Sequence, residues 1–357
     1  MLERDNFRID GHKLMFHPDR VADWMKGKAV CPIYLEIAPS GTCNHRCIFC
    51  AIDYLGYKRG ILDSDLLKET LKSARDLGVR SVMFAGEGEP LLHKDICEIA
   101  AFTKKLGIDA AITTNGVLLT KEKSLHLLKY LSWIRISLNA GISKTYAKVH
   151  RTSEEDFYKV LSNIKEAVRI KNKYKFKASI GVQFLLIPEN KTEVFTLAKL
   201  LKKAGVDYLT VKPYSQHPLS VCRMSPGLKY ENLISMGKSL QRIETRHFKI
   251  IFRDLTIARL SIAKDYQRCL GLPFWAYIDS CGDVYACSSF LGEKDFCYGN
   301  IYKESFSGII NGKRRRNIID RISLKMDATK CRQACRLDKI NSYLWELKHP
   351  GSHVNFI

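Results

Sequence analysis

Three cysteines near the N-terminus have types and spacing that point to metal chemistry. They stand in the segment Cys43-Asn-His-Arg-Cys47-Ile-Phe-Cys50, with gaps of three and two residues. Thiolates at this spacing can turn toward one centre. Together with His45 they would complete a tetrahedral zinc site. Alternatively, they would hold three irons of an iron–sulfur cluster and leave the fourth iron open. The spacing alone does not decide between the two.

The remaining cysteines strengthen the case for metal rather than disulfide chemistry. The chain has 12 cysteines in 357 residues, and a second group falls in its last quarter. The N-terminus is charged from its third residue, and no apolar run approaches the roughly 18 to 20 residues that span a bilayer. We therefore expect a cytoplasmic protein with no membrane partner. Disulfides are rare in that compartment, so metal ligation outranks a disulfide framework.

The formal charge of +21, from 58 basic and 37 acidic residues, indicates an attraction for anions. A field of this sign concentrates nucleic acid, phosphorylated small molecules, acidic peptides or a reductant protein. A solvated basic surface accounts for the same count equally well. The charge therefore favours anionic partners, but it does not identify which anion binds.

The elements that must position the first cysteine group form an alternation of strands and helices. Apolar runs bounded by proline and glycine predict strands, and helical periodicity with Ser64 and Ser153 as N-caps predicts helices between them. The predicted strands cover residues 33–38, 79–85, 108–113, 133–138, 176–187 and 206–212, and the helices cover 64–77, 95–106, 120–131, 154–171 and 192–204.

Repeated strand–helix units force parallel strands with right-handed crossovers. Six units are too few for a closed eight-fold barrel, so we expect an α/β fold with an open, partial (β/α)6 barrel. After Pro213 the alternation is predicted to end, and a small α+β domain organised by metal to follow. The predicted divisions are an N-terminal extension (1–31), the barrel (32–215), a helical connector (216–265), the cysteine-rich domain (266–345) and a tail (346–357).

The first cysteine motif, with Phe49 before its last cysteine, resembles the signature of radical S-adenosylmethionine (SAM) enzymes. Further resemblances follow in the family's order along residues 32–215. They are Gly86-Glu-Gly-Glu-Pro90 after the second strand, Thr114-Asn115-Gly116 after the third, and Ser137-Leu-Asn139 after the fourth.

This resemblance implies a [4Fe–4S] cluster held by Cys43, Cys47 and Cys50, whose open iron chelates SAM. Reductive cleavage of SAM then yields a 5′-deoxyadenosyl radical. Gly86–Pro90 would offer backbone carbonyls to the methionine ammonium, because glycine permits close approach. The residues expected to contact SAM are Phe49, Gly86, Glu87, Gly88, Glu89, Pro90, Asn115, Ser137, Asn139 and Gln183. Gln183, with His150 and Lys212, could instead bind substrate at the mouth of the barrel.

The second cysteine group is similar to the auxiliary-cluster domains called SPASM and twitch. Twelve residues separate Cys269 from Gly282, four separate Gly282 from Cys287, and Cys331 and Cys335 follow later. Only one close pair is present downstream, which resembles the twitch type more than the two-cluster SPASM pattern. The resemblance implies one auxiliary [4Fe–4S] cluster on these four cysteines. Four thiolates leave no iron open, which favours electron transfer or a structural role.

Cys281, in the predicted hairpin Asp279-Ser-Cys-Gly-Asp283, is the candidate catalytic residue. Its thiol could give a hydrogen atom to a substrate radical. A fifth cluster ligand and an ordinary half-buried thiol are the alternatives.

The leading hypothesis is a radical SAM enzyme that abstracts hydrogen from a small, polar or anionic substrate. By architectural likeness to single-auxiliary-cluster enzymes, that substrate is a sugar, aminosugar or nucleotide-linked sugar, which is oxidised or epimerised. A flavodoxin- or ferredoxin-like reductant is the expected partner, and nucleic acid is not. Maturation of a ribosomally made peptide is the second hypothesis. A non-catalytic iron–sulfur or zinc protein that binds RNA is the third.

Overall fold

The structure is a computed structural model that describes residues 7–9, 11–224, 228 and 233–356. Residues 1–6 and 10 of the expected N-terminal extension lie outside the described residues. So do residues 225–227 and 229–232 of the expected connector, and residue 357 of the expected tail.

One large, mostly parallel sheet forms the centre of the molecule, and its strand order is β12-β11-β10-β1-β4-β5-β6-β7-β8-β9. A separate antiparallel pair, β2 and β3, follows β1 in the chain. The strands are β1 (Tyr34–Ile37), β2 (Ser40–Thr42), β3 (Lys58–Ile61), β4 (Ser81–Phe84), β5 (Asp109–Thr114), β6 (Leu131–Ser137), β7 (Ser179–Leu186), β8 (Tyr208–Pro213), β9 (Lys249–Phe252), β10 (Trp275–Ile278), β11 (Asp283–Tyr285) and β12 (Cys297–Asn300).

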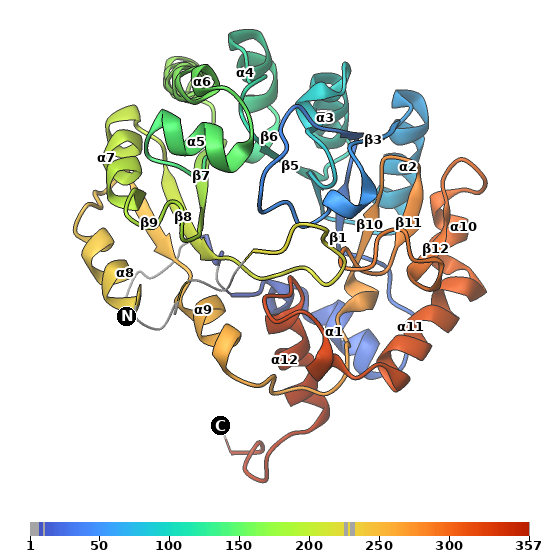
Figure 1. Ribbon diagram of the computed structural model, residues 1–357. Coiled ribbons are helices and arrows are strands. Elements are labelled where there is room, and N and C mark those ends of the chain that lie inside the picture. Colours follow the sequence, from blue (N-terminus) through green and yellow to red (C-terminus); the bar gives the residue numbers. More distant parts are fainter. Residues whose placement is uncertain (1–6, 10, 225–227, 229–232, 357) are drawn as a thin grey trace.

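Helices cover the outside of this curved sheet, as Figure 1 shows for the blue-to-green part of the chain. The helices are α1 (Pro18–Met25), α2 (Ser64–Asp76), α3 (Ile96–Lys105), α4 (Lys121–Leu128), α5 (Ser143–His150), α6 (Glu154–Tyr174), α7 (Val194–Ala204), α8 (Ile234–Gln241), α9 (Asp254–Ser261), α10 (Phe306–Asn311), α11 (Lys313–Lys325) and α12 (Asp338–Lys348). The predicted partial barrel is confirmed.

The side chains of the parallel strands alternate between an outer and an inner face. On β4, Val82 and Phe84 belong to the large core that packs under the helices. Met83 belongs to a separate small cluster with Ala111 of β5, and Trp133 of β6 packs against it. We call the side of the sheet that carries this small cluster the inner face. Because the period is two, Arg135 and Ser137 of β6 share this face with Trp133.

The sheet continues beyond the six predicted strands, so the expectation that the alternation ends at Pro213 is wrong. Strand β9 pairs with β8 in parallel and in register from Tyr208↔Lys249 to Val211↔Phe252. On the opposite side, β10 pairs in parallel with β1. The connector therefore contributes a barrel strand, and the cysteine-rich segment is joined to the barrel through hydrogen-bonded strands.

Two local predictions also need correction. The N-cap of α2 is Asp63 rather than Ser64: its carboxylate accepts hydrogen bonds from the backbone of Asp65 and Leu66 at 3.0 and 2.9 Å. The Ser64 hydroxyl instead donates to Asp95 at 2.6 Å. Helix α5, which the sequence reasoning did not predict, fits between β6 and α6 and ends at His150.

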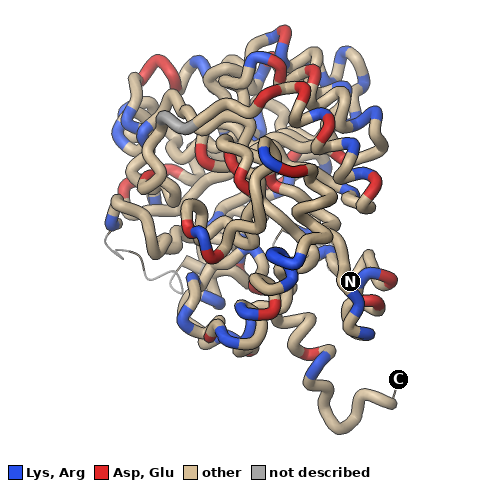
Figure 2. The backbone as a smooth tube through the Cα atoms, turned by 90° about the vertical axis from the view of Figure 1, so that its right-hand side faces the viewer, with Lys and Arg blue, Asp and Glu red and all other residues tan. Residues whose placement is uncertain are grey.

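No helix among the described residues is both long and apolar enough to cross a membrane. Acidic and basic residues are interspersed along the chain in the view of Figure 2.

Candidate active site

The first cysteine group lies on a loop that leaves β2 at the carboxyl end of β1, where parallel sheets carry their ligands. Backbone hydrogen bonds fix this loop against the end of α5. Arg46 N donates to the carbonyl of His150 at 3.1 Å, and Ile48 N donates to the carbonyl of Val149 at 3.0 Å. The Arg46 guanidinium donates to the carbonyl of Cys43 at 2.6 Å and lies over the ring of Tyr57. These contacts hold the three cysteines in one short turn.

Polar groups approach the sulfurs of this loop. His45 N donates to Cys43 Sγ at 3.5 Å, and Nδ1 of His150 lies 3.3 Å from Cys47 Sγ. Burial raises the pKa of Cys43 to about 11, because the charged thiolate is poorly solvated there. A metal centre that binds thiolates displaces these protons and receives preformed hydrogen-bond donors. The donor set therefore fits a thiolate-bound iron–sulfur cluster.

His45, the fourth ligand of the zinc alternative, is directed beneath the loop. Its ring is 1% exposed, and Nε2 lies 3.2 Å from Asp156 Oδ2. Together with Cys47 and His150 it forms a group whose potential ligand atoms lie within 4.8 Å of one another. Desolvation lowers the pKa of His150 well below its ordinary value, so its ring is neutral and can orient the loop.

The Gly86–Pro90 segment comes close to the strand that leads into the cysteine loop. A Cβ at Gly88 would lie 2.1 Å from the carbonyl oxygen of Ser40 and 2.4 Å from that of Thr42, so only glycine fits. Glu89 N donates to the same carbonyl of Thr42 at 2.8 Å. The side chain of Glu87 accepts a hydrogen bond from Ser280 N at 2.9 Å and thereby ties the segment to the turn after β10.

The carboxylate of Glu89 is buried and faces the protein. It accepts hydrogen bonds from Thr114 Oγ1 at 2.6 Å, Asn115 N at 2.7 Å and Leu91 N at 3.0 Å. Asn115 Nδ2 in turn donates to Asn44 Oδ1, within the cysteine motif, at 2.7 Å. Glu89 thus joins the two predicted SAM-binding motifs, and contacts from this segment to SAM would come from its backbone carbonyls.

The other side chains predicted to contact SAM differ in the contacts that they already make within the protein. Asn139 is buried, and its Oδ1 accepts from Leu185 N at 2.6 Å, so this side chain bridges β6 to β7. Ser137 and Gln183 are register partners on the inner face. Phe49 packs edge-on against His150 with ring centres 5.5 Å apart. Ser137 and Gln183, on the inner face, and Phe49, beside His150, remain predicted side-chain contacts to SAM.

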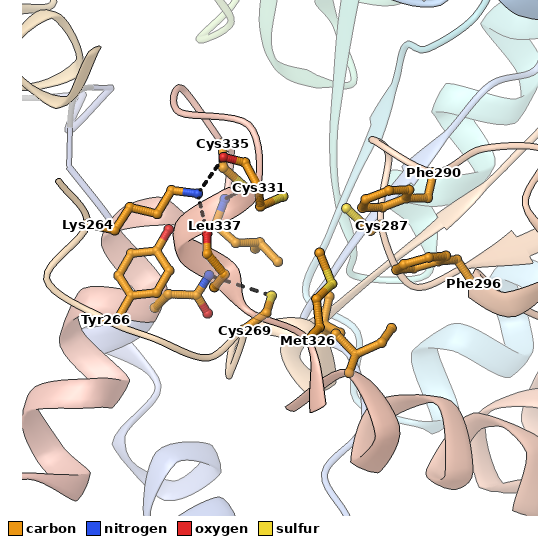
Figure 3. Close-up of a pocket in the computed structure, with 14 residues that line it drawn as sticks. Lys264, Tyr266, Cys269, Cys287, Phe290, Phe296, Met326, Cys331, Cys335 and Leu337 are labelled. Atoms are coloured by element: carbon orange, nitrogen blue, oxygen red, sulfur yellow. Dashed lines mark hydrogen bonds between the residues drawn. The ribbon is translucent and has the colours of Figure 1, made fainter. Parts of the chain in front are cut away.

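The second cysteine group converges on one cavity, although its members come from distant parts of the chain. Figure 3 shows Cys331 and Cys335 on one side of this cavity and Cys287 on the other. The residues that line it are Lys264, Tyr266, Cys269, Leu272, Cys287, Phe290, Phe296, Ile322, Met326, Ala328, Cys331, Cys335, Leu337 and Asn341. All four cysteines predicted to hold an auxiliary cluster are among them.

Hydrogen-bond donors approach three sulfurs of this cavity, which we call the auxiliary cavity. Leu337 N donates to Cys335 Sγ and Ser289 N to Cys287 Sγ, both at 3.4 Å, and the Asn341 amide donates to Cys269 Sγ at 3.6 Å. Such bonds stabilise thiolates and tune the potential of a cluster. Four thiols in an apolar cavity with donors aimed at the sulfurs fit a fully thiolate-ligated cluster.

Cys281 lies apart from this cavity, in the turn that joins β10 to β11. Its backbone N donates to Asp279 Oδ1 at 2.9 Å, and its carbonyl accepts from Asn300 Nδ2 at 3.0 Å. The turn is at the carboxyl end of β10, next to the Gly86–Pro90 segment that Ser280 contacts. Cys281 is therefore at the same end of the sheet as the first cysteine group.

Sequence reasoning missed a loop that covers the first cysteine group. The Ser220 hydroxyl donates to the carbonyl of Cys50 at 3.1 Å, and Cys222 Sγ donates to the carbonyl of Ile48 at 2.6 Å. Asp53 accepts from the backbone of Val221 and Cys222. A Cys in a polar loop after the last predicted strand was the available signal.

Two family models match the chain, one over the segment with the first cysteine group and one over the segment with the second. The family model of the Radical SAM superfamily matches residues 37–201. The SPASM model, an iron–sulfur cluster-binding domain, matches residues 269–336.

The curated relatives share about half of this chain. A protein of Saccharolobus islandicus named "Probable GTP 3′,8-cyclase" is 29% identical over 192 residues, which are 54% of this chain and 59% of the relative. A "Tungsten-containing aldehyde ferredoxin oxidoreductase cofactor-modifying protein" of Pyrococcus furiosus is 30% identical over 184 residues, half of each chain. The chain thus spans only about half to three fifths of these relatives.

Solved structures share the fold over nearly the whole chain. Streptococcus suis SuiB bound to S-adenosylmethionine superposes with a TM-score of 0.68 and 19% identity, over 95% of this chain and 79% of SuiB. The structure of anSMEcpe with bound AdoMet gives a TM-score of 0.58 and 17% identity, over 89% of this chain and 96% of that one.

Proposed function

The chain belongs to the radical SAM enzymes that carry a C-terminal SPASM domain, and from this premise we propose that it abstracts hydrogen from a small, polar, anionic substrate of the sugar class. Such enzymes bind SAM and [4Fe–4S] clusters, so the non-catalytic RNA-binding alternative is set aside. The observation that carries the radical chemistry is the placement of two separate thiol groups, one on the loop after β2 and one in the auxiliary cavity. The formal charge of +21 supports an anionic substrate.

We assign Cys43, Cys47 and Cys50 to the SAM-binding cluster and Cys269, Cys287, Cys331 and Cys335 to the auxiliary cluster. When bound, these clusters supply the electron that splits SAM into methionine and a 5′-deoxyadenosyl radical, and a one-electron acceptor on the product side. Other residues of the chain position the segments that would contact SAM and the first cluster. Glu89 fixes the Gly86–Pro90 backbone against the end of β5, and the loop around Ser220 covers Cys50.

Two outcomes for the substrate radical are open to this site. Loss of one electron and one proton from a hydroxyl-bearing radical gives a ketone. Alternatively, the Cys281 thiol gives its hydrogen atom to the radical, which restores the C–H bond with inverted configuration. The resulting thiyl radical then needs one electron and one proton from the reductant. Cys281 lies at the end of the sheet where the radical is formed, which supports this role.

Deuterium transfer tests the proposal directly. The anaerobically reconstituted protein is incubated with reductant, SAM and candidate sugars that carry deuterium at single carbons. We expect deuterium in 5′-deoxyadenosine with the true substrate and no SAM cleavage in Cys43→Ala. Cys97→Ala, which removes a half-buried thiol of α3 that belongs to neither cysteine group, is the matched control and should cleave SAM normally. Normal cleavage by Cys43→Ala would overturn the assignment.

A peptide is the second candidate substrate. The likeness to SuiB bound to its precursor peptide SuiA, with a TM-score of 0.66, extends over 95% of this chain. The same assay with deuterated peptides separates the two candidates, because only the true substrate transfers deuterium.

A further inference from the structure

Three adjacent strands carry a row of polar side chains on the inner face of the sheet. The register pairs Ser137 of β6 with Gln183 of β7, and Gln183 with Thr210 of β8. Thr210 is 1% exposed, and its hydroxyl has no hydrogen-bond partner among the described residues. Leaving a buried hydroxyl unpaired costs about 1–3 kcal/mol. A polar ligand bound on this face would give the Thr210 hydroxyl a partner.

A cation stands on each side of this row. Arg135 precedes Ser137 by two positions and Lys212 follows Thr210 by two, so both share the inner face. The Arg135 guanidinium lies over Trp133, 5.1 Å from the ring centre. Nε of Arg135 is buried and finds no acceptor in the part of the chain that the structure describes.

The surroundings of Lys212 are also positive. Burial, followed by the charges of Arg253, Arg135, Arg332 and Arg336, lowers the pKa of Lys212 well below its ordinary value. Cations gathered in this way repel one another, and protein around them excludes the water that would screen the repulsion. The chain keeps them together at a cost in stability.

The carboxylate that faces this group from β1, that of Glu36, is shared: Arg336 acts on it most strongly, and Arg135 and Lys212 act on it as well. Glu36 forms an ion pair with Arg336 at 2.8 Å, and Arg336 also donates to the hydroxyl of Tyr34 at 3.1 Å. Arg332 donates to the carbonyl of Ser215 at 2.9 Å. In contrast to the interspersed charges of Figure 2, the inner face around Arg135 and Lys212 has an excess of positive charge.

We propose that Arg135, Thr210 and Lys212 form a subsite that binds a phosphate group of the substrate. This inference rests on the proposed function, because it places the substrate on the inner face, and it narrows the substrate class. A phosphate carries up to two negative charges and several acceptor oxygens, which match an arginine fork and a lysine ammonium. A nucleotide-linked sugar belongs to this class. An aminosugar would add a like charge and is disfavoured.

Binding of inorganic pyrophosphate to the reconstituted, SAM-loaded protein tests the subsite. Calorimetry at physiological ionic strength should show one saturable site per chain. Lys212→Met and Arg135→Met should each weaken binding at least tenfold. The matched control Lys199→Met, at an exposed position of α7, should bind as the wild type does. Succinate, a dicarboxylate, should bind at least tenfold more weakly than pyrophosphate.

Each outcome has a defined consequence. Lys212→Met removes one charge from a group of cations that repel one another, so its ligand-free thermal midpoint should equal or exceed that of the wild type, which separates lost binding from misfolding. Absent pyrophosphate binding, equal affinity in Lys212→Met, or equal binding of succinate would overturn the phosphate subsite. SAM cleavage by the wild type is measured on the same preparation. If cleavage is normal but pyrophosphate does not bind, this inference fails alone, whereas absent cleavage refutes the proposed function.

Discussion

Glu89 is the residue whose replacement tests the framework of the site most sharply. Its carboxylate is buried, and three donors point at its two oxygens: Thr114 Oγ1 and Leu91 N at Oε1, and Asn115 N at Oε2. Burial raises the pKa of this carboxyl, and the three hydrogen bonds act in the opposite direction. Since every neighbour donates, the geometry is satisfied only by an acceptor at both oxygens.

The variant Glu89→Gln keeps the shape and replaces one acceptor by an NH2 donor. If the glutamine oxygen stays at the Oε1 position, the amide faces Asn115 N, and both groups lose their partner. Each unsatisfied buried group costs about 1–3 kcal/mol. We therefore expect a loss of about 2–6 kcal/mol in the free energy of unfolding. SAM affinity should fall as well, since Glu89 fixes both the Gly86–Pro90 backbone and the end of β5.

Urea unfolding of the reconstituted protein under anaerobic conditions measures the first effect, and equilibrium binding of SAM measures the second. Glu69→Gln on α2 is the matched control: Glu69 is 66% exposed in its side chain and pairs with Lys72. An exposed pair of this kind contributes about 0–1 kcal/mol. A Glu89→Gln variant as stable as this control, with unchanged SAM affinity, would refute the reasoning.

Three further predictions follow from single contacts. Gly88→Ala forces a Cβ to within 2.1 Å of the Ser40 carbonyl, so SAM affinity should drop at least tenfold in equilibrium binding. Asn341→Ala removes the donor to Cys269 Sγ and two further backbone hydrogen bonds, so the auxiliary cluster should become harder to reduce in a redox titration, with a stability loss of about 2–4 kcal/mol. Cys281→Ala should retain SAM cleavage; an unchanged product eliminates hydrogen donation, and lost epimer supports it.

The sequence was sufficient to predict those strands and helices that are determined by the apolar periodicity of their own residues. The strands of the first half are apolar runs between helices of clear periodicity, and the structure has β4 to β8 at the predicted places. The cysteine motif and Gly86–Pro90 could also be recognised, because both are short segments whose residue types and spacing are fixed within a few positions. The convergence of Cys269 and Cys335 came from a resemblance, since 65 residues separate them in the chain.

What the sequence did not reveal depends on pairing across long distances. Strand β9 follows a polar connector, and its apolar run, residues 250–252, is only three residues long, so its apolar character was too weak to mark a barrel strand. The cations of the inner face come from β6, β8 and the segment around Cys335, and each alone looks like an ordinary surface residue. These cations indicate a binding site for an anion only when the strand register shows that Arg135 and Lys212 lie on one face.

The two cysteine groups sit at opposite ends of neighbouring strands, and we propose that the substrate binds between them. The first group follows the carboxyl end of β1. The auxiliary cavity draws Cys269 from before the amino end of β10, and Cys287 from after β11, which runs back toward that same end. Four strand residues at about 3.3 Å each set the ends on the order of 13 Å apart.

Between these two ends lies the inner face. Gly86 lies against the buried Tyr277 hydroxyl, close enough that a Cβ there would approach it to 2.1 Å, and Arg336, the residue after Cys335, reaches across to Glu36. A substrate held on this face by Arg135 and Lys212 would thus have the hydrogen-abstracting end of the sheet on one side and the electron acceptor on the other. In this proposed arrangement, oxidation of the substrate would have its two steps, hydrogen abstraction and electron transfer, at opposite ends of the same face.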